Sequence, residues 1–467
     1  MIKDKRKKAI LEIVAPLGLA YLAAVLEKNN YQVKILDCAL GLYMPDLVHS
    51  LTCYSPDVLG ITATSISFAS AQKVAVQARK LFPKSVIVIG GPHVTALPRE
   101  AMSSGSFDIG VIGEGEVTFL ELVKRIETSG LSRLQDIDGL VYHDQNGNEL
   151  QTGRRGFISD LSELPFPARH LLPPLSAYSP FPASYRKMPV ATLMSSRGCP
   201  MGCTFCDQAV FGQVYRTRDA DNILDEIELA QREFGAREIR FYDDNFTWNK
   251  DLIFEICEKI KKRGIRIPWI CFASVNSVSK ELLKSMKEAG CWQILFGLES
   301  GDENVLMRLK KKITLADNRK AVYLAKEAGL SVRADFVVGT PWDTKETLRK
   351  TLNFSKELPI DYAHFIKFMP FPGSEIYKML TEKGYRFDFN QRTSMMDHND
   401  IMYVPESLKK QELTDFLFRA RREFYFRAAY MMRRALCAES WLQLKAQILG
   451  FFALFLHLRK DEKGTSN

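Results

Sequence analysis

The sequence predicts an α/β protein built from two successive series of strands and helices. Short apolar runs that end in glycine or a small polar residue alternate with stretches of helical periodicity, a pattern typical of parallel sheets covered by helices. The first series, over residues 1–135, predicts a Rossmann-like, doubly wound parallel sheet. The second, over residues 189–385, predicts a partial (β/α)6 barrel of the TIM type. A basic, amphipathic helical region over residues 386–467 completes the chain.

The first series begins with a helix at 17–28. Strands are expected at 32–36, 58–62, 86–89 and 109–112, with helices at 69–81 and from Val117. The last two strands run into Gly90-Gly91-Pro92 and Gly113-Glu114-Gly115-Glu116. Ligands of doubly wound sheets bind beyond the carboxyl ends of the strands, so these turns are the first candidates for a binding site.

Residues 136–188 separate the two series. A strand near 139–142, the turn Asp144-Gln145-Asn146-Gly147-Asn148 and the proline-rich run 164–182 predict a hairpin followed by a linker. The second series then places six strands at 190–194, 239–242, 269–273, 293–297, 332–339 and 364–369. The intervening helices are expected at 221–234, 250–263, 280–289, 315–328 and 345–358.

Composition places the chain among soluble globular proteins of the reducing cytoplasm. Its 467 residues are 46% hydrophobic and 25% charged, without a recognisable secretory signal or a run of about 20 apolar residues. Nine cysteines are an odd number for a disulfide framework. The net charge of +9 is concentrated near the end, where residues 419–467 hold ten Lys or Arg against four Asp or Glu.

The strongest chemical signal is a group of three cysteines directly after the first barrel strand. Cys199, Cys203 and Cys206 lie within eight residues, in the segment Ser196-Arg197-Gly198-Cys199-Pro200-Met201-Gly202-Cys203-Thr204-Phe205-Cys206. Thiolates are soft ligands that suit iron–sulfur clusters or zinc. No fourth Cys or His follows at the spacing of a structural zinc site, so a four-iron cluster with one open iron is favoured over zinc or buried thiols.

This C-x3-C-x2-C pattern, with Phe205 before the last cysteine, closely resembles the radical S-adenosylmethionine (SAM) superfamily. The resemblance implies a [4Fe–4S] cluster on Cys199, Cys203 and Cys206. It also implies that the open iron binds SAM, which is cleaved reductively to a 5′-deoxyadenosyl radical. An electron donor such as flavodoxin or ferredoxin is implied as well.

Other segments at barrel strand ends extend the resemblance. Asp243 and Asp244 match positions that receive the methionine amine, although one of them can instead cap the next helix. Glu299 matches a glutamate near the ribose or methionine, and Gly339 a turn near the adenine, or a simple tight turn. Where members often have Arg, this chain has Ser274, and Arg333 is a candidate replacement.

The first domain resembles the cobalamin-binding domain that precedes the barrel in one large branch of the superfamily. Glycines at strand ends let the backbone approach the corrin closely. The residues that carry the expectation are Thr62, Ser65, Gly90, Gly91, Pro92, His93, Gly113, Glu114, Gly115 and Glu116. The Asp-x-His-x-x-Gly pattern of some B12 enzymes would need His at Ala39, so a histidine from that loop is not expected to ligate cobalt, nor is His93. A generic doubly wound sheet also has such glycines.

We therefore expect a cobalamin-dependent radical SAM enzyme that methylates an unactivated carbon of a hydrophobic small molecule, such as a tetrapyrrole or a polycyclic lipid. A radical cyclase like the anaerobic magnesium-protoporphyrin ester cyclase is the first alternative. A non-catalytic cobalamin or redox sensor is the second. A methylthiotransferase would need three more cysteines in the N-terminal domain, whereas only Cys38 and Cys53 precede Cys199.

The C-terminal helices allow two interpretations. Arg419, Arg421, Arg422, Arg427, Arg433 and Arg434 alternate with aromatic residues, and 448–456 is almost wholly apolar. This composition suits peripheral contact with an anionic membrane, or a helix whose apolar side packs on the barrel. No nucleic-acid-binding module is recognisable, so a nucleic-acid partner is not expected.

Overall fold

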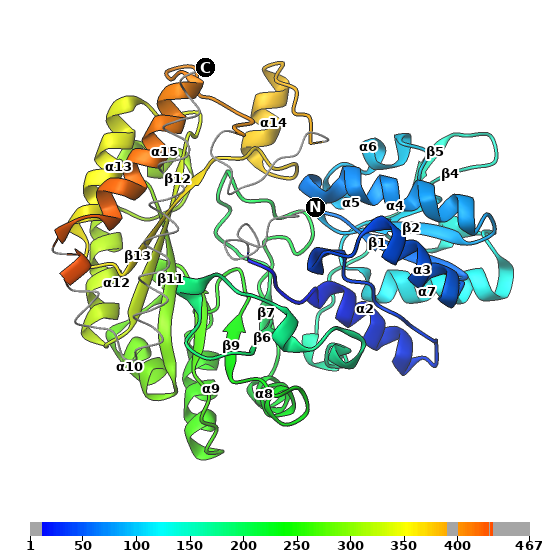
Figure 1. Ribbon diagram of the computed structural model, residues 1–467, viewed down its shortest axis with the longest axis horizontal. Coiled ribbons are helices and arrows are strands. Elements are labelled where there is room, and N and C mark those ends of the chain that lie inside the picture. The colour runs from blue at the N-terminus through cyan, green and yellow to red at the C-terminus, as the bar shows by residue number, and fades with distance from the viewer. Residues whose placement is uncertain (1–11, 390–399, 429, 433–467) are drawn as a thin grey trace.

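The computed structural model describes residues 12–389, 400–428 and 430–432 of the chain. These residues form two α/β units that lie side by side, the N-terminal unit to the right and the barrel to the left in Figure 1. The order of elements confirms the predicted fold class, with a doubly wound unit first, a strand–helix barrel second and a helix at the end.

A five-stranded sheet forms the first unit, in the order β1-β2-β3-β4-β5. The strands β1, β2 and β3 are parallel, and β4 and β5 continue the sheet as an antiparallel hairpin. Their bounds are Val58–Thr62, Val86–Gly90, Ile109–Val111, Leu140–His143 and Glu149–Gln151. The helices are α2 (Leu17–Lys28), α3 (Met44–Tyr54), α4 (Phe68–Leu81), α5 (Pro92–Ala96), α6 (Pro98–Ser103) and α7 (Gly115–Ser129).

Two details of this unit differ from the sequence prediction. Residues 32–36 do not form a strand, although Val33 and Ile35 still pack beside α2 as an alternating pattern requires. Nearby, Ile13 forms an isolated antiparallel bridge with Ser179 instead of joining a sheet strand. The hairpin that we assigned to the linker pairs with β3, so the sheet extends as far as Gln151.

The second unit is an open, six-stranded parallel sheet in the order β13-β12-β11-β10-β9-β6. The strands are β6 (Val190–Leu193), β9 (Glu238–Phe241), β10 (Trp269–Ala273), β11 (Cys291–Glu299), β12 (Ser331–Val338) and β13 (Tyr362–Lys367). The helices are α8 (Ala220–Phe234), α9 (Lys250–Lys262), α10 (Lys280–Glu288), α11 (Glu303–Arg308), α12 (Leu315–Glu327), α13 (Lys345–Glu357) and α14 (Glu375–Glu382). A short antiparallel pair, β7 (Ser196–Arg197) with β8 (Arg216–Thr217), brackets the cysteine segment.

Apolar periodicity and end-capping account for this second unit. Strand residues such as Trp269, Cys271 and Ala273 point toward the helices and join one large buried cluster, whereas Ile270 and Phe272 point to the inner face. Helices start where a side chain accepts a free backbone N–H, as at Thr314 and Thr344. Such caps stabilise a helix by about 1 kcal/mol each.

The helix α15 (Lys410–Tyr425) covers the free edge of β13 (Figure 1). The Tyr425 hydroxyl donates to the Ala363 carbonyl at 2.8 Å and accepts from the Ala363 N–H at 3.2 Å, which satisfies polar groups that an edge strand leaves open. Leu413, Phe416 and Phe424 are buried against the barrel.

This packing bears on the two interpretations of the C-terminal helices. The apolar side of α15 faces the barrel, which does not support the expected membrane contact for this helix. Within the described ranges no helix is long and apolar enough to span a bilayer. Arg433, Arg434 and the apolar segment 448–456 lie outside the described residues.

The amino-terminal end of β9 contains a fully buried carboxyl group. Glu238 accepts backbone N–H bonds from Arg186 and Lys187, both at 2.7 Å, and the indole N–H of Trp292 at 2.9 Å. Burial raises its pKa to about 7, against the opposing effect of these donors. The folded state therefore favours the neutral acid, and its contribution to stability is lost as the pH rises from about 4.5 through about 7.

We therefore predict that Glu238→Gln makes unfolding less sensitive to pH. Between pH 5 and pH 8 the free energy of unfolding of the wild-type protein should fall relative to E238Q by up to about 3 kcal/mol. Urea unfolding of both proteins at the two pH values measures this difference. Glu233→Gln, at an exposed position of α8, is the matched control and should behave like wild type. Parallel pH profiles for E238Q and wild type would contradict the prediction.

Candidate functional site

The cysteine segment follows β6 at the carboxyl end of that strand. We call residues 198–206 the cysteine loop. It starts at Gly198, whose φ of 83° is left-handed and whose position leaves no room for a side chain, because a Cβ would lie 2.3 Å from the Val214 carbonyl oxygen. Cys199 and Cys203 are half-buried, and Cys206 is exposed.

Neighbouring barrel elements hold the loop by its backbone. The Cys199 N–H donates to the Gly212 carbonyl at 3.3 Å. Thr204 donates to the carbonyl of Leu309, at the end of α11, and accepts from the N–H of Ile376 in α14, at 3.1 and 2.9 Å. The loop is therefore fixed by elements that follow β11 and β13 as well as by its own strand.

The three thiols share one electrostatic environment. Burial raises the pKa of the half-buried thiols of Cys199 and Cys203. Although Cys206 is exposed by surface area, the protein atoms around its thiol desolvate it and raise its pKa to about 12, with Asp244 and the other two thiols adding to the effect. The ammonium of Lys311 acts in the opposite direction on all three. The Lys311 ammonium therefore lies within electrostatic reach of all three thiols.

The number of thiols and their spacing in the loop suit a four-iron cluster. Each cysteine of such a cube binds a different iron at a different corner, which leaves one iron free. Among the described residues no three Cys, His, Asp or Glu side chains are grouped closely enough to hold one metal ion.

The two aspartates after β9 have different environments. Asp243 is buried and accepts three hydrogen bonds at the start of the cysteine segment: from the Ser195 N–H at 3.0 Å, the Ser195 hydroxyl at 2.7 Å and the Ser196 hydroxyl at 2.5 Å. Burial raises its pKa to about 6, although these donors lower it. Asp244 is exposed beside Cys199 and Cys206. Of this pair, only Asp244 has an exposed side chain, and its contact with a cofactor stays a prediction.

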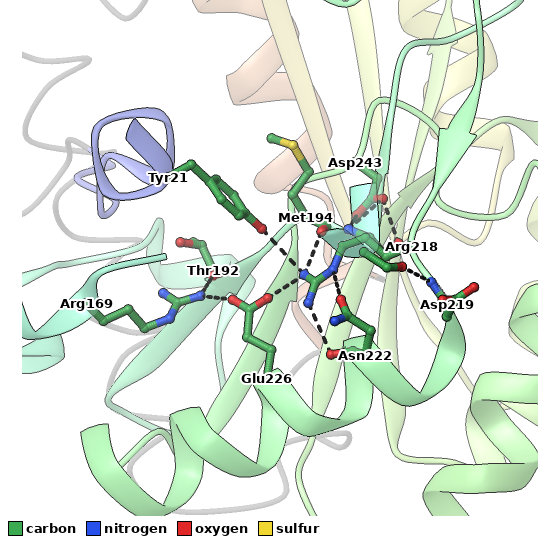
Figure 2. Close-up of polar contacts among 11 residues, drawn as sticks. Tyr21, Arg169, Thr192, Met194, Arg218, Asp219, Asn222, Glu226 and Asp243 are labelled. Atoms are coloured by element: carbon green, nitrogen blue, oxygen red, sulfur yellow. Dashed lines mark hydrogen bonds and ion pairs between the residues drawn. The ribbon is translucent and has the colours of Figure 1, made fainter. Parts of the chain in front are cut away.

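Behind Asp243 lies a buried chain of polar contacts that reaches the first unit. Figure 2 shows Tyr21 of α2 pointing toward the guanidinium of Arg218, which also pairs with Glu226 and bonds the Met194 carbonyl. The Arg218 N–H donates to the Ser195 carbonyl at 2.9 Å, next to the bonds with Asp243. Arg169 completes the chain on the other oxygen of Glu226 at 2.6 Å.

Glu299 ends β11 in a conformation that side chains rarely adopt. Its φ is 62°, and its buried carboxylate accepts from the Lys311 ammonium at 2.8 Å. Burial alone would lower the pKa of Lys311, but Glu299 and the thiols of Cys203 and Cys206 raise it overall. The Lys311 ammonium lies 5.9 Å from the ring centre of Phe205. Glu299, Lys311 and Phe205 therefore form one side of the cysteine site.

Gly339 directly follows the carboxyl end of β12, and Arg333 lies within that strand, each with partners inside the protein. Gly339 forms a tight turn, with its N–H bound to the Asp343 carboxylate at 3.0 Å, and Leu413 of α15 covers it closely. Arg333 is paired with Asp335 at 2.9 Å and also bonds Ser184 and His364. A cofactor contact of either residue stays a prediction.

The expected cobalamin residues surround the carboxyl ends of β1, β2 and β3. A Cβ at Gly90 or Gly113 would meet no protein atom within 4 Å, so both glycines border open space where a flat ligand can approach. Gly91 is required for another reason, because its φ is 97° and a Cβ would lie 2.6 Å from the Thr62 hydroxyl. Pro92 starts α5 directly behind these glycines. The open strand ends fit a corrin lying across them.

His93 is part of the protein interior. Its ring is fully buried, stacks 3.9 Å from the ring of Phe68 and bonds the Ser65 hydroxyl at 3.2 Å through Nδ1. Burial lowers the pKa of His93 to about 4, and Nε2 has no partner among the described residues. The position of the ring gives no support for cobalt ligation by His93, and it occupies the Ser65 hydroxyl that we expected at the cofactor.

Glu114 and Glu116 bind arginines of the barrel unit. Glu114 pairs with Arg197 and Arg216, each at 2.8 Å, and Glu116 pairs with Arg197 at 2.6 Å. All of these side chains are buried. The turn Gly113-Glu114-Gly115-Glu116 thus faces the start of the cysteine loop, with its carboxylates used inside the protein. Contacts of these carboxylates with a cofactor stay a prediction.

Sequence patterns did not reveal several of the residues that shape the site. Lys311 stands in a run of three lysines, which resembles an exposed basic loop. Arg197 and Arg216 flank the cysteine motif without any periodic signal, and their acids lie about 80 to 100 positions earlier in the chain. The only available signal was the identity of Ser195-Ser196-Arg197 directly before the motif.

Comparisons with known proteins agree with this geometry. The model of the Radical SAM superfamily matches residues 193–355, and that of the B12 binding domain matches residues 8–123. An uncharacterized methyltransferase of Pyrococcus horikoshii is 33% identical over 90% of this chain and 89% of its own length. The anaerobic magnesium-protoporphyrin IX monomethyl ester cyclase of Cereibacter sphaeroides is 29% identical over 89% of this chain and 67% of its own.

A solved structure shows the same fold. The radical SAM methyltransferase TsrM of Kitasatospora setae superposes with a TM-score of 0.69 at 16% identity, covering 88% of each chain. The two family models fall on the two α/β units described above, and the cysteine loop lies within the second. The chain is therefore an enzyme of the radical SAM superfamily and belongs to its family of cobalamin-dependent methyltransferases with an N-terminal B12-binding domain.

Proposed function

We propose that this enzyme transfers a methyl group to an unactivated carbon of a hydrophobic small molecule, with the reaction taking place between the two units. The observation that carries the proposal is the contact of the turn Gly113–Glu116, at the open strand ends of the first sheet, with Arg197 at the start of the cysteine loop. Two candidate cofactor sites thus border one interdomain space.

In this proposal different residues of the cysteine site bind the cluster, bind SAM and position the loop. Cys199, Cys203 and Cys206 hold the [4Fe–4S] cluster. Asp244, exposed beside Cys199 and Cys206, accepts the ammonium of the SAM methionine. Glu299 lies on the side of the cysteine loop formed with Lys311 and Phe205, and the Lys311 ammonium donates to its carboxylate at 2.8 Å. Asp243 fixes Ser195 and Ser196, and with them the direction in which the loop leaves β6.

When the cluster, SAM and cobalamin are bound, they supply a 5′-deoxyadenosyl radical from SAM and a methyl group on cobalamin. The protein orients them and excludes water from the space between. Gly90 and Gly113 leave room for the corrin at the first sheet. A reduced electron carrier, such as flavodoxin or ferredoxin, supplies electrons in this proposal.

The inner face of the barrel supports a hydrophobic substrate. Tyr242 and Phe272 pack 5.8 Å apart on adjacent strands, with the Arg240 guanidinium 4.8 and 5.3 Å from their rings. The Arg240 guanidinium also pairs with Glu12, so these rings present an apolar surface without a free charge, which suits a hydrophobic molecule.

The second candidate function is radical ring closure or oxidation. A relative of 29% identity is named as a magnesium-protoporphyrin ester cyclase, and the same cofactor set serves both outcomes. The two functions differ in their products, since only methyl transfer consumes a second SAM as methyl donor.

The product experiment distinguishes them. The full chain, reconstituted anaerobically with iron, sulfide and hydroxocobalamin, is incubated with SAM, a reductant and an extract of small hydrophobic metabolites. We expect 5′-deoxyadenosine together with S-adenosylhomocysteine, and neither from Cys206→Ala. 5′-Deoxyadenosine alone would favour the cyclase. If a cluster-loaded enzyme forms neither product, both functions are contradicted.

Single replacement of each of the two adjacent aspartates by asparagine tests their separate roles. Asp243→Asn replaces an acceptor of three hydrogen bonds with an amide that directs N–H groups at donors, so iron bound per chain should fall several-fold. Asp244→Asn should load iron like wild type but bind SAM about tenfold more weakly, because it loses one charged hydrogen bond. Iron content and SAM titration measure both effects.

The matched pair also provides the contrary outcome. If D243N loads a full cluster and loses only SAM affinity, Asp243 is a SAM ligand, and the assignment of the two aspartates is wrong.

A further inference from the structure

A buried group of charges joins the two units directly beside the cysteine loop. Arg197 donates one N–H to Glu114 at 2.8 Å and another to Glu116 at 2.6 Å. Its guanidinium lies between the rings of Tyr21 and Phe211, 5.3 and 5.2 Å from their centres. Arg197 is 4% exposed, so this cation is held on every side by the protein.

Glu114 is the second centre of the group. Besides Arg197 it accepts from Arg216 at 2.8 Å and from the N–H of Ile158 at 2.8 Å. Arg216 is paired with Arg197 across the β7–β8 ladder, so both arginines come from the two strands that bracket the cysteine loop. Glu114 comes from the turn after β3, and Glu116 from the first turn of α7 that follows it.

Because these charged groups are buried, their ion pairs must keep a defined geometry. A buried charge that loses its partner is strongly unfavourable, so neither side can move away without the other. The planar guanidinium reaches two carboxylates at once, which a lysine ammonium at the same position does less well. Arg197 stands two positions before Cys199, with only Gly198 between them. Any shift of the turn is therefore passed to the first cysteine.

The same turn borders the open strand ends of the first sheet. Gly113, adjacent to Glu114, has a φ of 81° and no protein atom within 4 Å of a Cβ position. A ligand that occupies this space would restrict the turn, and the turn holds Arg197. The observations thus place one rigid connection between the two cofactor sites.

We propose that Arg197 couples the two sites, so that a cluster on the cysteine loop and cobalamin at the first sheet each strengthen the binding of the other. Arg197 is a positioning residue, since it acts through Glu114, Glu116 and the loop backbone. The inference rests on the proposed positions of the two cofactors. Coupling between sites is reciprocal in binding free energy, so it can be measured from the cobalamin side alone.

The test compares the dissociation constant of hydroxocobalamin for the full chain with and without its cluster, anaerobically and without SAM. For wild type we expect cobalamin to bind about tenfold more tightly to the cluster-loaded protein. Arg197→Met should bring this ratio close to one, and Arg197→Lys should give an intermediate value. Glu116→Gln, which keeps the shape but removes one charge, should also lower the ratio, and it provides the test if R197M does not fold.

Glu121→Gln is the matched control. Glu121 lies in the same helix α7 and also binds an arginine, Arg155, but at a more exposed position away from the cysteine loop. E121Q should keep the wild-type ratio. A wild-type ratio of one, or an unchanged ratio in R197M, R197K and E116Q, would overturn the coupling. Failure of wild type to bind cobalamin in either state would instead contradict the proposed function.

Discussion

The cysteine loop depends on buried charge at the residues that precede it. Ser195 and Ser196 are held by the Asp243 carboxylate, and Arg197 is held by two glutamates of the other unit. In a low-dielectric interior such groups are costly unless every partner is in place. The loop therefore has one defined direction before any cofactor binds, which matters for a site whose ligands come from a nine-residue segment.

This constraint also explains how the two units act as one enzyme. A doubly wound sheet and a barrel each bind ligands at the carboxyl ends of their strands, and here those ends are joined by Glu114 and Arg197. Tyr21 adds a contact from α2 to Arg197 and Arg218. These contacts fix the strand ends of the two units relative to one another, as the proposed reaction between them requires.

Regular elements were predictable because their signals are local. Apolar periodicity placed β10 at its observed bounds and the other barrel strands within two residues. The prediction of a strand at residues 32–36 was wrong because alternation shows only which side chains are buried, whereas a strand also needs a neighbouring strand to pair with. The hairpin at 140–151 was found, but its pairing with β3 is a contact between segments far apart in sequence.

The cysteine motif was predictable for the same reason, since its three thiols lie in one short segment. The division of roles between Asp243 and Asp244 was not, because adjacent carboxylates look alike in a sequence and differ only in their neighbours. The resemblance placed Glu114 and Glu116 at cobalamin, whereas the structure pairs them with Arg197 and Arg216. Lys311 was not predicted either, because its sequence context of three lysines does not show that it pairs with Glu299.

The central claim is that cluster and cobalamin face one another in the space between the two units. An electron paramagnetic resonance spectrum of the reduced protein loaded with both groups tests it most directly. The account predicts that the signals of the reduced cluster and of Co(II) broaden or split each other, compared with protein loaded with either one. A spectrum equal to the sum of the two separate signals would contradict it.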